Sequence, residues 1–321
     1  MRGQFLRYLL GRAAAAFALV FLVSSGALLL AQLAPGDYAS EFGRDPASIA
    51  ADRHRLGLDR PFAEQYGRWL KRSVTLDLGE SFYYRRPVTA LVRERAANTA
   101  LLAVVALLLA TALGVPGGIL TGSTRGPAVS LVRGTSVALL SVPPLITSLL
   151  LLTLAARTGW LPVGGIGNPS PDASWIARLI VSARHLVIPA LALALPLAAT
   201  IERLQSQALR EAMNRPSTMA ARARGLPRSR IVGRHAWRLS LGPLLAIYGI
   251  LIGSLFSGSF AVELVTSWPG LGDLMRQALM ARDTHLVAGC AAAGALFLAI
   301  GVFAADVAHG ALDPRVAGSR S

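Results

Sequence analysis

The sequence predicts an all-helical membrane protein with six transmembrane helices, and three observations support this fold class. Apolar residues make up 53% of the 321 residues, charged residues only 15%, and the mean hydropathy is +0.51. The apolar residues gather into blocks of about 20 residues, which is the length that a helix needs to cross a bilayer. The blocks lie at about 9–33, 98–121, 129–154, 185–204, 241–261 and 286–308.

The first block resembles a signal peptide, because it follows Arg2, Arg7 and Arg12. Its apolar core is longer than that of an ordinary signal peptide, and no small-x-small cleavage site precedes Pro35. Further apolar blocks follow it along the chain. We therefore expect 9–33 to be retained as the first transmembrane helix.

Arginine residues near the ends of the blocks predict the orientation in the membrane. The segment 203–238 holds nine arginines against Glu202 and Glu211, whereas 262–285 is nearly balanced in charge. Arginine favours the cytoplasmic side of short loops, so we expect 203–238 and both termini to be cytoplasmic. The 35–97 segment then falls outside, since long loops cross a membrane largely regardless of their charge.

The 35–97 segment contains start and stop signals for two short amphipathic helices. Asp45 is placed to cap a helix that begins at Pro46 and stops at Gly57, and Pro61 opens a second helix. The second helix carries four large apolar residues on one face: Phe62, Tyr66, Trp69 and Leu70. Such a face more often packs or lies in the membrane interface than binds a ligand, and we expect the same here.

Glycine and proline predict departures from regular helix in other places. The residues 159–183 are rich in both and predict an irregular external loop with turns. Pro143 and Pro144 lie within the third block, and Pro189 and Pro196 within the fourth, where each favours a kink. Kinked spans fit a transporter or a channel, although an ordinary packed bundle explains any single proline equally well.

Several classes of function are disfavoured by the residues. The sequence has no Walker A motif for binding ATP and no His-Glu-x-x-His pair for zinc. The net charge of +15 does not indicate nucleic acid, because the arginines flank apolar blocks and no basic run alternates with aromatic residues. A serine protease pair of Ser259 with His285 or His309 is disfavoured, because Gly258-Ser259 is ordinary packing in a helix rich in small residues.

The residues give no indication of a resident metal or a redox function. Cys290 is the only cysteine, so the chain forms no internal disulfide and no cysteine-based metal site. It is more readily explained as a small apolar packing residue. The histidines His185, His285 and His309 are scattered and form no cluster with Cys or Asp.

The most distinctive polar segment is Pro216-Ser-Thr-Met-Ala-Ala-Arg-Ala-Arg-Gly225, between the fourth and fifth blocks. It predicts a helix about 13 Å long that ends at Gly225 in the left-handed conformation. Its arginines favour the cytoplasmic face, where the helix would contact a partner. Three small side chains would let that partner approach closely: Ala220, Ala221 and Ala223. The arginines would pair with acidic groups of the partner or with anionic lipid headgroups, and the residues alone leave both open.

These residues resemble the permease subunits of ATP-binding-cassette importers. Met219-Ala-Ala-Arg-Ala-Arg-Gly225, with His235-Ala-Trp-Arg238 and Pro243, is similar to the cytoplasmic coupling motif of that family. Further motifs resemble the first permease subunit (the B subunit) of the dipeptide, oligopeptide and nickel type: Pro35-Gly-Asp37, Leu56-Gly-Leu-Asp-Arg-Pro61 with Gln65-Tyr66, Asp77-Leu-Gly-Glu-Ser81, Glu263, Ser267-Trp-Pro-Gly-Leu-Gly272, Asp306 and Asp313-Pro-Arg315. They occur in order over nearly the whole chain.

The resemblance implies one transmembrane permease domain, residues 1–321, with the type I importer fold in the bacterial inner membrane. It implies an extracytoplasmic insertion at 35–97 and a cytoplasmic coupling loop at 205–240. The ATPase-coupling residues would be Met219, Ala220, Ala221, Arg222, Ala223, Arg224 and Gly225. The residues of an extracytoplasmic gate, on the side of the binding protein, would be Glu263, Trp268, Pro269 and Gly270.

The resemblance also implies partners and a mechanism. The partners are a homologous second permease, two ATPase subunits, an extracytoplasmic solute-binding protein and membrane lipid, with no nucleic acid. The chain itself would be no enzyme and would hold no cofactor, since the ATPase subunits bind ATP and Mg²⁺. Closure of the ATPases would move the 216–225 helix and open the kinked spans toward the other side.

The coupling motif departs from the family pattern in three places. Met219 stands where the short consensus often has an acidic residue, and Leu239 stands where asparagine commonly follows His-x-x-Arg. Arg215-Pro216-Ser217 replaces an acidic and an aromatic residue ahead of the helix. These differences affect the fit to a particular ATPase.

The expected function is import of di- or oligopeptides, with alternatives for the cargo and for the class. Related permeases carry nickel complexes or glutathione, and the lack of a His, Cys and Asp cluster favours peptides over nickel. An autonomous channel or secondary transporter would show internal repeats or ionisable residues near mid-membrane. The spans of this chain are almost free of charge, and Asp306 lies near an end.

Overall fold

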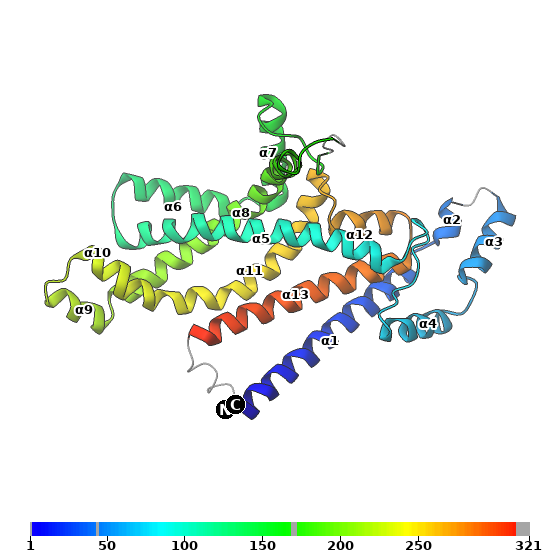
Figure 1. Cartoon of the computed structure of the whole chain (residues 1–321), viewed down its shortest axis with the longest axis horizontal. Coiled ribbons are helices and arrows are strands. Elements are labelled where there is room, and N and C mark those ends of the chain that lie inside the picture. Colours follow the sequence, from blue (N-terminus) through cyan, green and yellow to red (C-terminus); the bar gives the residue numbers. More distant parts are fainter. Residues whose placement is uncertain (1, 43–44, 168–171, 313–321) are drawn as a thin grey trace. The chain divides into compact units, whose positions relative to one another are not determined.

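The computed structural model of the chain describes residues 2–42, 45–167 and 172–312, which form helices and their connecting segments (Figure 1). The helices are α1 (Arg2–Leu33), α2 (Tyr38–Phe42), α3 (Pro46–Leu56), α4 (Phe62–Val74), α5 (Val88–Ser123), α6 (Pro127–Leu140), α7 (Pro144–Thr158), α8 (Trp175–Met213), α9 (Pro216–Ala223), α10 (Arg228–Arg230), a π-helical segment (Ile231–Ala236), α11 (Trp237–Thr266), α12 (Leu271–Met280) and α13 (Thr284–Leu312). The motif residues 313–315 and the loop residues 168–171 lie outside the described residues.

The chain divides into two compact units that are each described separately. The first unit consists of Met1–Ala100 and Pro269–Ala299. The second unit consists of Leu101–Trp268 and Ile300–Ser321.

Every predicted apolar block falls in a helix or in a pair of helices. Among the described residues, five helices are long and apolar enough to cross a membrane: Leu10–Leu33, Val88–Ser123, Trp175–Met213, Arg228–Thr266 and Thr284–Ala305. The predicted third span is divided between α6 and α7, which are bent by 109° and form a sixth span if taken together. Pro143 at this bend is extended, with φ −59° and ψ 150°, because a residue before proline avoids the helical region. The predicted membrane fold is confirmed, with one span sharply broken.

The α8 helix corrects the expectation for 159–183. It begins at Trp175, so the residues 175–183 are helical rather than an irregular loop. Ser174 starts the helix, because its Oγ accepts a hydrogen bond from the Ala177 N–H at 3.3 Å. The helix continues for 39 residues, and neither Pro189 nor Pro196 ends it.

In the first unit, local capping rules form both predicted helices between α1 and α5. The Asp45 Oδ1 accepts a hydrogen bond from the Ser48 N–H at 2.8 Å, and the Asp45 N–H donates to the Ser48 Oγ at 3.3 Å. Gly57 ends α3 in the left-handed conformation with a φ of 68°. Pro61 precedes the first residue of α4. The predicted start and stop signals of this segment are confirmed.

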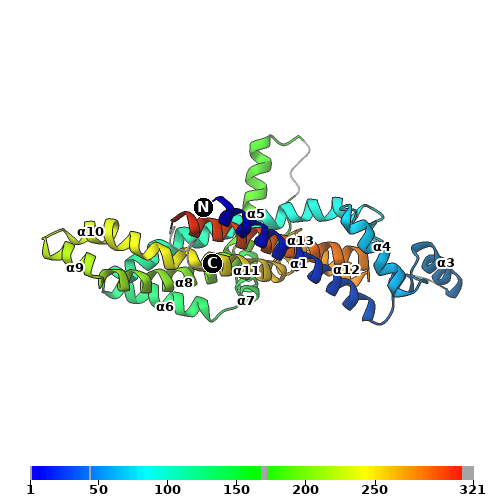
Figure 2. The ribbon, with the colours of Figure 1, turned by 90° about the horizontal axis from the view of Figure 1, so that it is seen from below.

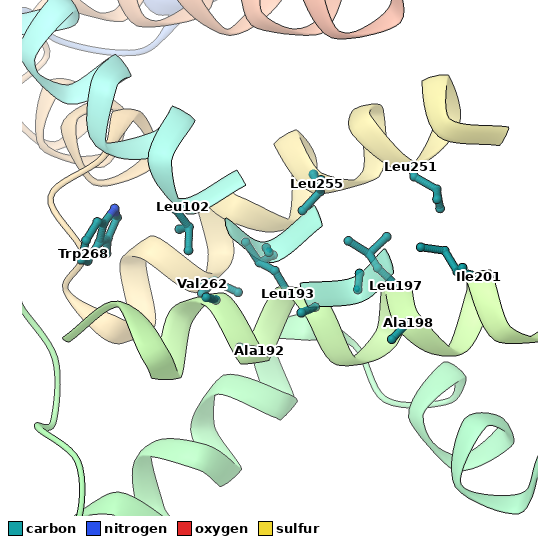
Figure 3. Packing of buried hydrophobic residues seen from close by; sticks show 14 of the residues in the cluster. Leu102, Ala192, Leu193, Leu197, Ala198, Ile201, Leu251, Leu255, Val262 and Trp268 are labelled. Atoms are coloured by element: carbon teal, nitrogen blue, oxygen red, sulfur yellow. The ribbon is translucent and has the colours of Figure 1, made fainter. Parts of the chain in front are cut away.

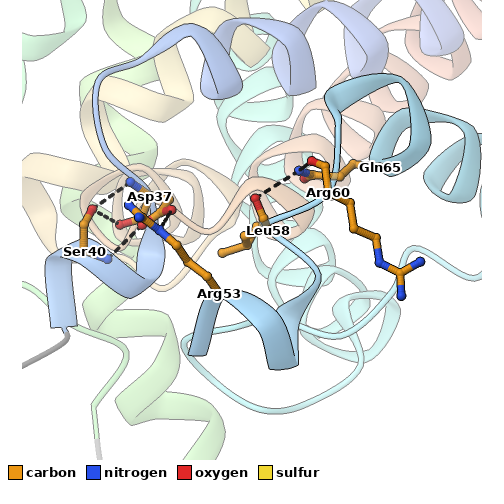
Figure 4. Close-up of polar contacts among 6 residues, drawn as sticks. All are labelled: Asp37, Ser40, Arg53, Leu58, Arg60 and Gln65. Carbon is orange, nitrogen blue, oxygen red and sulfur yellow. Dashed lines mark hydrogen bonds and ion pairs between the residues drawn. The ribbon is translucent and has the colours of Figure 1, made fainter. Parts of the chain in front are cut away.

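Polar contacts fasten these short helices to one another (Figure 4). The Asp37 carboxylate accepts hydrogen bonds from the Arg53 Nε at 2.7 Å and from the Ser40 N–H at 2.8 Å. The Gln65 Nε2 donates to the Arg60 carbonyl at 2.8 Å. The contacts of Asp37 connect the start of α2 to α3. The Gln65 hydrogen bond stabilises the turn between α3 and α4.

The aromatic face of α4 packs against two spans of its own unit. Trp69 is buried in a cluster with Leu28 of α1 and Ala288 of α13. The Tyr66 hydroxyl lies 3.2 Å from the Oγ of Ser25 in α1, within hydrogen-bond distance. The expectation of a packed face is confirmed.

A buried carboxylate holds the turn before α13. The Asp283 Oδ2 accepts hydrogen bonds from the Ser81 hydroxyl at 2.6 Å and the Tyr83 N–H at 3.1 Å. Its Oδ1 accepts from the Leu286 N–H at 3.1 Å. The side chain is fully buried, and these bonds replace the water that it loses on burial. Asp283 thereby joins the 79–85 loop to the first turn of α13.

In the second unit, the core lies between α8, α11 and the later part of α5. Leu193, Leu197 and Ile201 of α8 share one buried cluster with Leu251 and Leu255 of α11 (Figure 3). Lipid is as apolar as leucine, so close packing rather than exclusion of water stabilises helix contacts inside a membrane. The shape of the contacting faces therefore decides how these helices fit.

Glycines bring α5 close to α8. A Cβ atom added to Gly114, Gly118 or Gly122 would lie within 2.8 Å of an atom of α8. These glycines follow one another at a spacing of four residues, which places them on one face of α5. Small residues at this spacing let two helix backbones approach closely. We refer to Gly114, Gly118 and Gly122 as the glycine seam.

Candidate coupling site

The α9 helix lies at one end of the long α8 and α11 helices, as both views show (Figure 1, Figure 2). Pro216 is its first residue, where a missing N–H costs no hydrogen bond. Arg224 caps its end, and Gly225 follows with a φ of 75°. The Gly225 N–H donates to the Arg222 carbonyl at 3.0 Å. The predicted helix and its glycine stop are confirmed.

The inner face of α9 packs within the second unit. Ala221 is fully buried in a cluster with five residues of α8 and the π-helical segment: Leu209, Ala212, Met213, Ile231 and Ala236. The buried Thr218 hydroxyl donates to the Ala212 carbonyl at 2.8 Å. Ala221 was expected to let a partner approach, and this expectation is wrong because its methyl group faces the chain itself.

The outer face of α9 is exposed. It carries Met219, whose exposed fraction is 58%, together with Ala220, Arg222, Ala223 and Arg224. Among the described residues, neither Arg222 nor Arg224 has a carboxylate within ion-pair distance. This face therefore offers a partner one large apolar side chain, two small ones and two guanidinium groups that are free to bind acidic groups.

Two further hydrogen bonds join the elements around α9. The Arg228 Nη2 of α10 donates to the Ser123 carbonyl at the end of α5. The Gln205 Nε2 of α8 donates to the Ser240 Oγ of α11 at 2.9 Å. The chain after α10 runs through the π-helical segment into α11, so α9 is joined to α11 by a short, mostly helical connection. π-helical turns often occur at functional sites.

Sequence reasoning missed these connections. Thr218 lies inside the motif but was assigned no role, and its position two residues after Pro216 places it in the first turn beside α8. Arg228 contacts a residue that lies 105 positions away, so no local pattern could have revealed it. The spacing of the glycine seam was a readable signal, because glycines at every fourth position are typical of close helix contacts.

The four predicted gate residues lie mostly inside the chain. Glu263 and Trp268 of the second unit are buried, and the Trp268 N–H donates to the Glu263 carbonyl at 3.0 Å. In the first unit, Gly270 is buried, and the half-buried Pro269 accepts a hydrogen bond from the Asn98 Nδ2 at 2.8 Å. These residues are largely inaccessible in this chain, and their place at an extracytoplasmic gate stays a prediction. In the described ranges, no three His, Cys, Asp or Glu residues gather in a metal-binding group.

Comparisons with known proteins cover both units. A family model described as the binding-protein-dependent transport system inner membrane component matches residues 114–318, and a model of the N-terminal part of such components matches 5–103. A putative peptide permease protein of Brucella suis is 32% identical over 97% of this chain and 99% of its own length. The oligopeptide transport system permease protein AppB of Bacillus subtilis is 29% identical over 96% and 98%. The di/tripeptide transport system permease protein DppB of Pseudomonas aeruginosa is 30% identical over 89% and 91%.

Proposed function

Because this chain belongs to the family of binding-protein-dependent transport system inner membrane components, we propose that it is a permease subunit of an ATP-driven importer of di- or oligopeptides. The chain is a multi-pass protein of the inner membrane. The observation that carries the proposal is the similarity, over nearly the full length, to relatives named for peptide transport. The residues have no site for covalent chemistry in this proposal, and ATP with Mg²⁺ belongs to partner subunits.

The outer face of α9 is the contact for an ATPase subunit in this proposal. Its exposed Met219 would enter an apolar depression, and Arg222 and Arg224 would pair with acidic groups of the ATPase. The fully buried Ala221 and Thr218 fasten the opposite face to α8, so movement of the ATPase is transmitted to the spans rather than absorbed by a loose loop. Alternating access of the pore follows from such rigid-body motion.

The membrane arrangement is part of the same proposal. The chain is one permease domain in which both termini and the 205–240 loop are cytoplasmic, and 35–97 is extracytoplasmic. A homologous second permease, two ATPases and a solute-binding protein complete the importer. The extracytoplasmic gate in this proposal includes Glu263, Trp268 and Gly270, which are buried, and the half-buried Pro269.

The experiment compares the isolated chain with the assembled importer in proteoliposomes. The assembly should accumulate a labelled dipeptide only with ATP and loaded binding protein, and its ATP hydrolysis should rise when that protein is added. The isolated chain should neither hydrolyse ATP nor pass the peptide. Peptide flux through the isolated chain would favour an autonomous channel, and ATP-driven uptake of Ni²⁺ without peptide uptake would contradict the proposed cargo.

A further inference from the structure

The first unit contains an open, strongly basic cavity that the proposed function does not use. Its volume is about 430 Å³, and it is formed by the end of α3, the exposed side of α4, the 78–85 loop and the start of α13. In the described part of the chain, its lining has one acidic residue, Glu80, and five arginines: Arg55, Arg60, Arg68, Arg72 and Arg85.

Two of these arginines have no counter-ion among the described residues. Arg55 pairs with Asp52 at 2.7 Å, and Glu64 pairs with Arg60 at 2.6 Å and Arg68 at 3.7 Å. For Arg72 and Arg85, no carboxylate in the described ranges lies within ion-pair distance. Two unpaired guanidinium groups beside one cavity attract an anion, because each can donate several hydrogen bonds to oxygen atoms in a planar fork.

Trp69 adds a second, independent observation to the wall of this cavity. Its side chain is buried, with an exposed fraction of 5%, and it lines the cavity. In the described part of the chain, its indole Nε1–H has no hydrogen-bond partner. Buried donors of this kind are rarely left without an acceptor, and an oxygen atom of a ligand in the cavity would supply one.

The packing of α4 indicates the depth of the cavity in the membrane. Trp69 contacts Leu28, five residues before the end of the α1 span at Leu33, and Ala288, four residues after the start of α13 at Thr284. At 1.5 Å per residue, both contacts lie about 6–8 Å inside the spans, so the aromatic face of α4 lies within the membrane boundary. The exposed side of α4 lies about one helix diameter, roughly 10 Å, from that face. It therefore reaches the headgroup layer, which is about 5–8 Å thick on each side of the bilayer.

We propose that this cavity binds the phosphate headgroup of an anionic phospholipid, with Arg72 and Arg85 as its charged ligands and the Trp69 indole as a further donor. Arginine and tryptophan are the side chains that favour this depth, and a phosphodiester supplies the oxygen acceptors that all three lack. The shared chemistry is an oxyanion, which a free phosphate or a peptide carboxylate would also present. Because the cavity lies at the depth of the lipid headgroups, we assign the oxyanion to a phospholipid.

The test is native mass spectrometry of the purified full chain with phosphatidylglycerol or phosphatidylcholine of equal acyl length. The parent chain should retain phosphatidylglycerol in preference to phosphatidylcholine. Joint Arg72→Gln and Arg85→Gln substitution should weaken phosphatidylglycerol binding at least about tenfold. Arg93→Gln, at an exposed arginine of the same unit outside the cavity lining, removes charge elsewhere and should change binding less than about twofold.

A second variant separates binding from folding. Trp69→Phe keeps an aromatic ring against Leu28 but removes the donor, so it should weaken lipid binding without lowering the unfolding temperature. Equal retention of both lipids, or unchanged binding by the double variant, would overturn the proposal. Displacement of the lipid by millimolar inorganic phosphate or by the dipeptide Ala-Ala would overturn the lipid assignment, because it would identify a soluble anion as the ligand. This measurement of lipid binding does not depend on peptide transport. The lipid proposal can therefore fail while the proposed function holds.

Discussion

Asp37 lies between α1 and α2, and its neighbours determine the pKa of its carboxyl group. Partial burial alone would raise the pKa of this carboxyl, but hydrogen bonds from Arg53 and Ser40 and the charge of Arg53 outweigh burial and hold the pKa below its ordinary 3.8. The unfolded chain therefore takes up this proton more readily than the folded chain. The carboxylate adds stability above the unfolded pKa, and that stability is lost as the pH falls through the folded pKa.

Asp37→Asn should lower the unfolding temperature of the purified chain in detergent at neutral pH. The difference from the parent should stay constant down to about pH 5 and narrow as the pH falls below about 4, because the parent then loses the same charge. Added salt should also reduce it, since the ion pair is partly exposed. Asp59→Asn removes an exposed carboxylate of the same segment that accepts no hydrogen bond within the described residues, and it serves as control. A difference that persists unchanged at low pH would contradict this account of Asp37.

At the scale of helices, the glycine seam decides how α5 and α8 fit. A Cβ at Gly118 would lie 2.6 Å from the Gln205 Cβ and 2.7 Å from the Glu202 carbonyl oxygen. The carbonyl belongs to the backbone, so the helices themselves would have to separate. The contact matters beyond packing, because Gln205 also bonds to Ser240 of α11.

Gly118→Ala should destabilise the chain by about 1–3 kcal/mol, because overpacking forces backbone shifts. Gly134→Ala in α6 makes the same chemical change where no atom lies within 4 Å, and it should leave stability unchanged or slightly higher. Denaturant unfolding in mixed micelles measures the free energy of unfolding of both variants and of the parent. Equal stability of Gly118→Ala and the parent would show that the helices are not in close contact at this position.

Helix limits that depend on neighbouring residues could be predicted from the sequence. Asp45, Pro46 and Gly57 act through bonds within α3, and Gly225 acts through its own backbone conformation, so these predictions are confirmed. The start of α8 at Trp175 was missed, because glycine and proline are frequent just before it and only the Ser174 cap marked the helix. Local rules thus predict where most helices begin and end.

Contacts between distant segments could not be predicted in the same way. The α9 helix has only eight residues, so its sequence did not reveal that Ala221 faces α8 and the π-helical segment. The burial of Glu263 and Trp268 likewise depends on packing, not on their own motif. The basic cavity draws its lining from four separate segments, and no single stretch of sequence predicts it.

At the scale of the whole molecule, the proposed orientation places the 35–97 segment and α9 on opposite sides of the membrane. In a Cys290→Ala background, Thr75→Cys should react with an impermeant thiol reagent added to spheroplasts, and Ser217→Cys should react only after lysis. Thr75 and Ser217 are both exposed, and Cys290 is fully buried. The side of the membrane on which an introduced cysteine lies, rather than its burial, therefore determines whether it reacts. Labelling of Ser217→Cys in intact spheroplasts would refute the proposed orientation.

The most direct test of the central claim is ATP-driven peptide uptake by the assembled importer carrying Ala220→Glu. Ala220 is exposed, and a glutamate there would add bulk to the outer face of α9 and pair with Arg224 four residues later. The variant should assemble in the membrane at the parent level yet lose ATPase binding and about tenfold or more of its uptake, because the glutamate adds bulk to the contact and occupies a guanidinium that would otherwise bind the ATPase. Thr124→Glu, which adds the same charge at the exposed residue that follows α5, should transport like the parent. Parental uptake by Ala220→Glu would contradict the claim that α9 couples this chain to an ATPase.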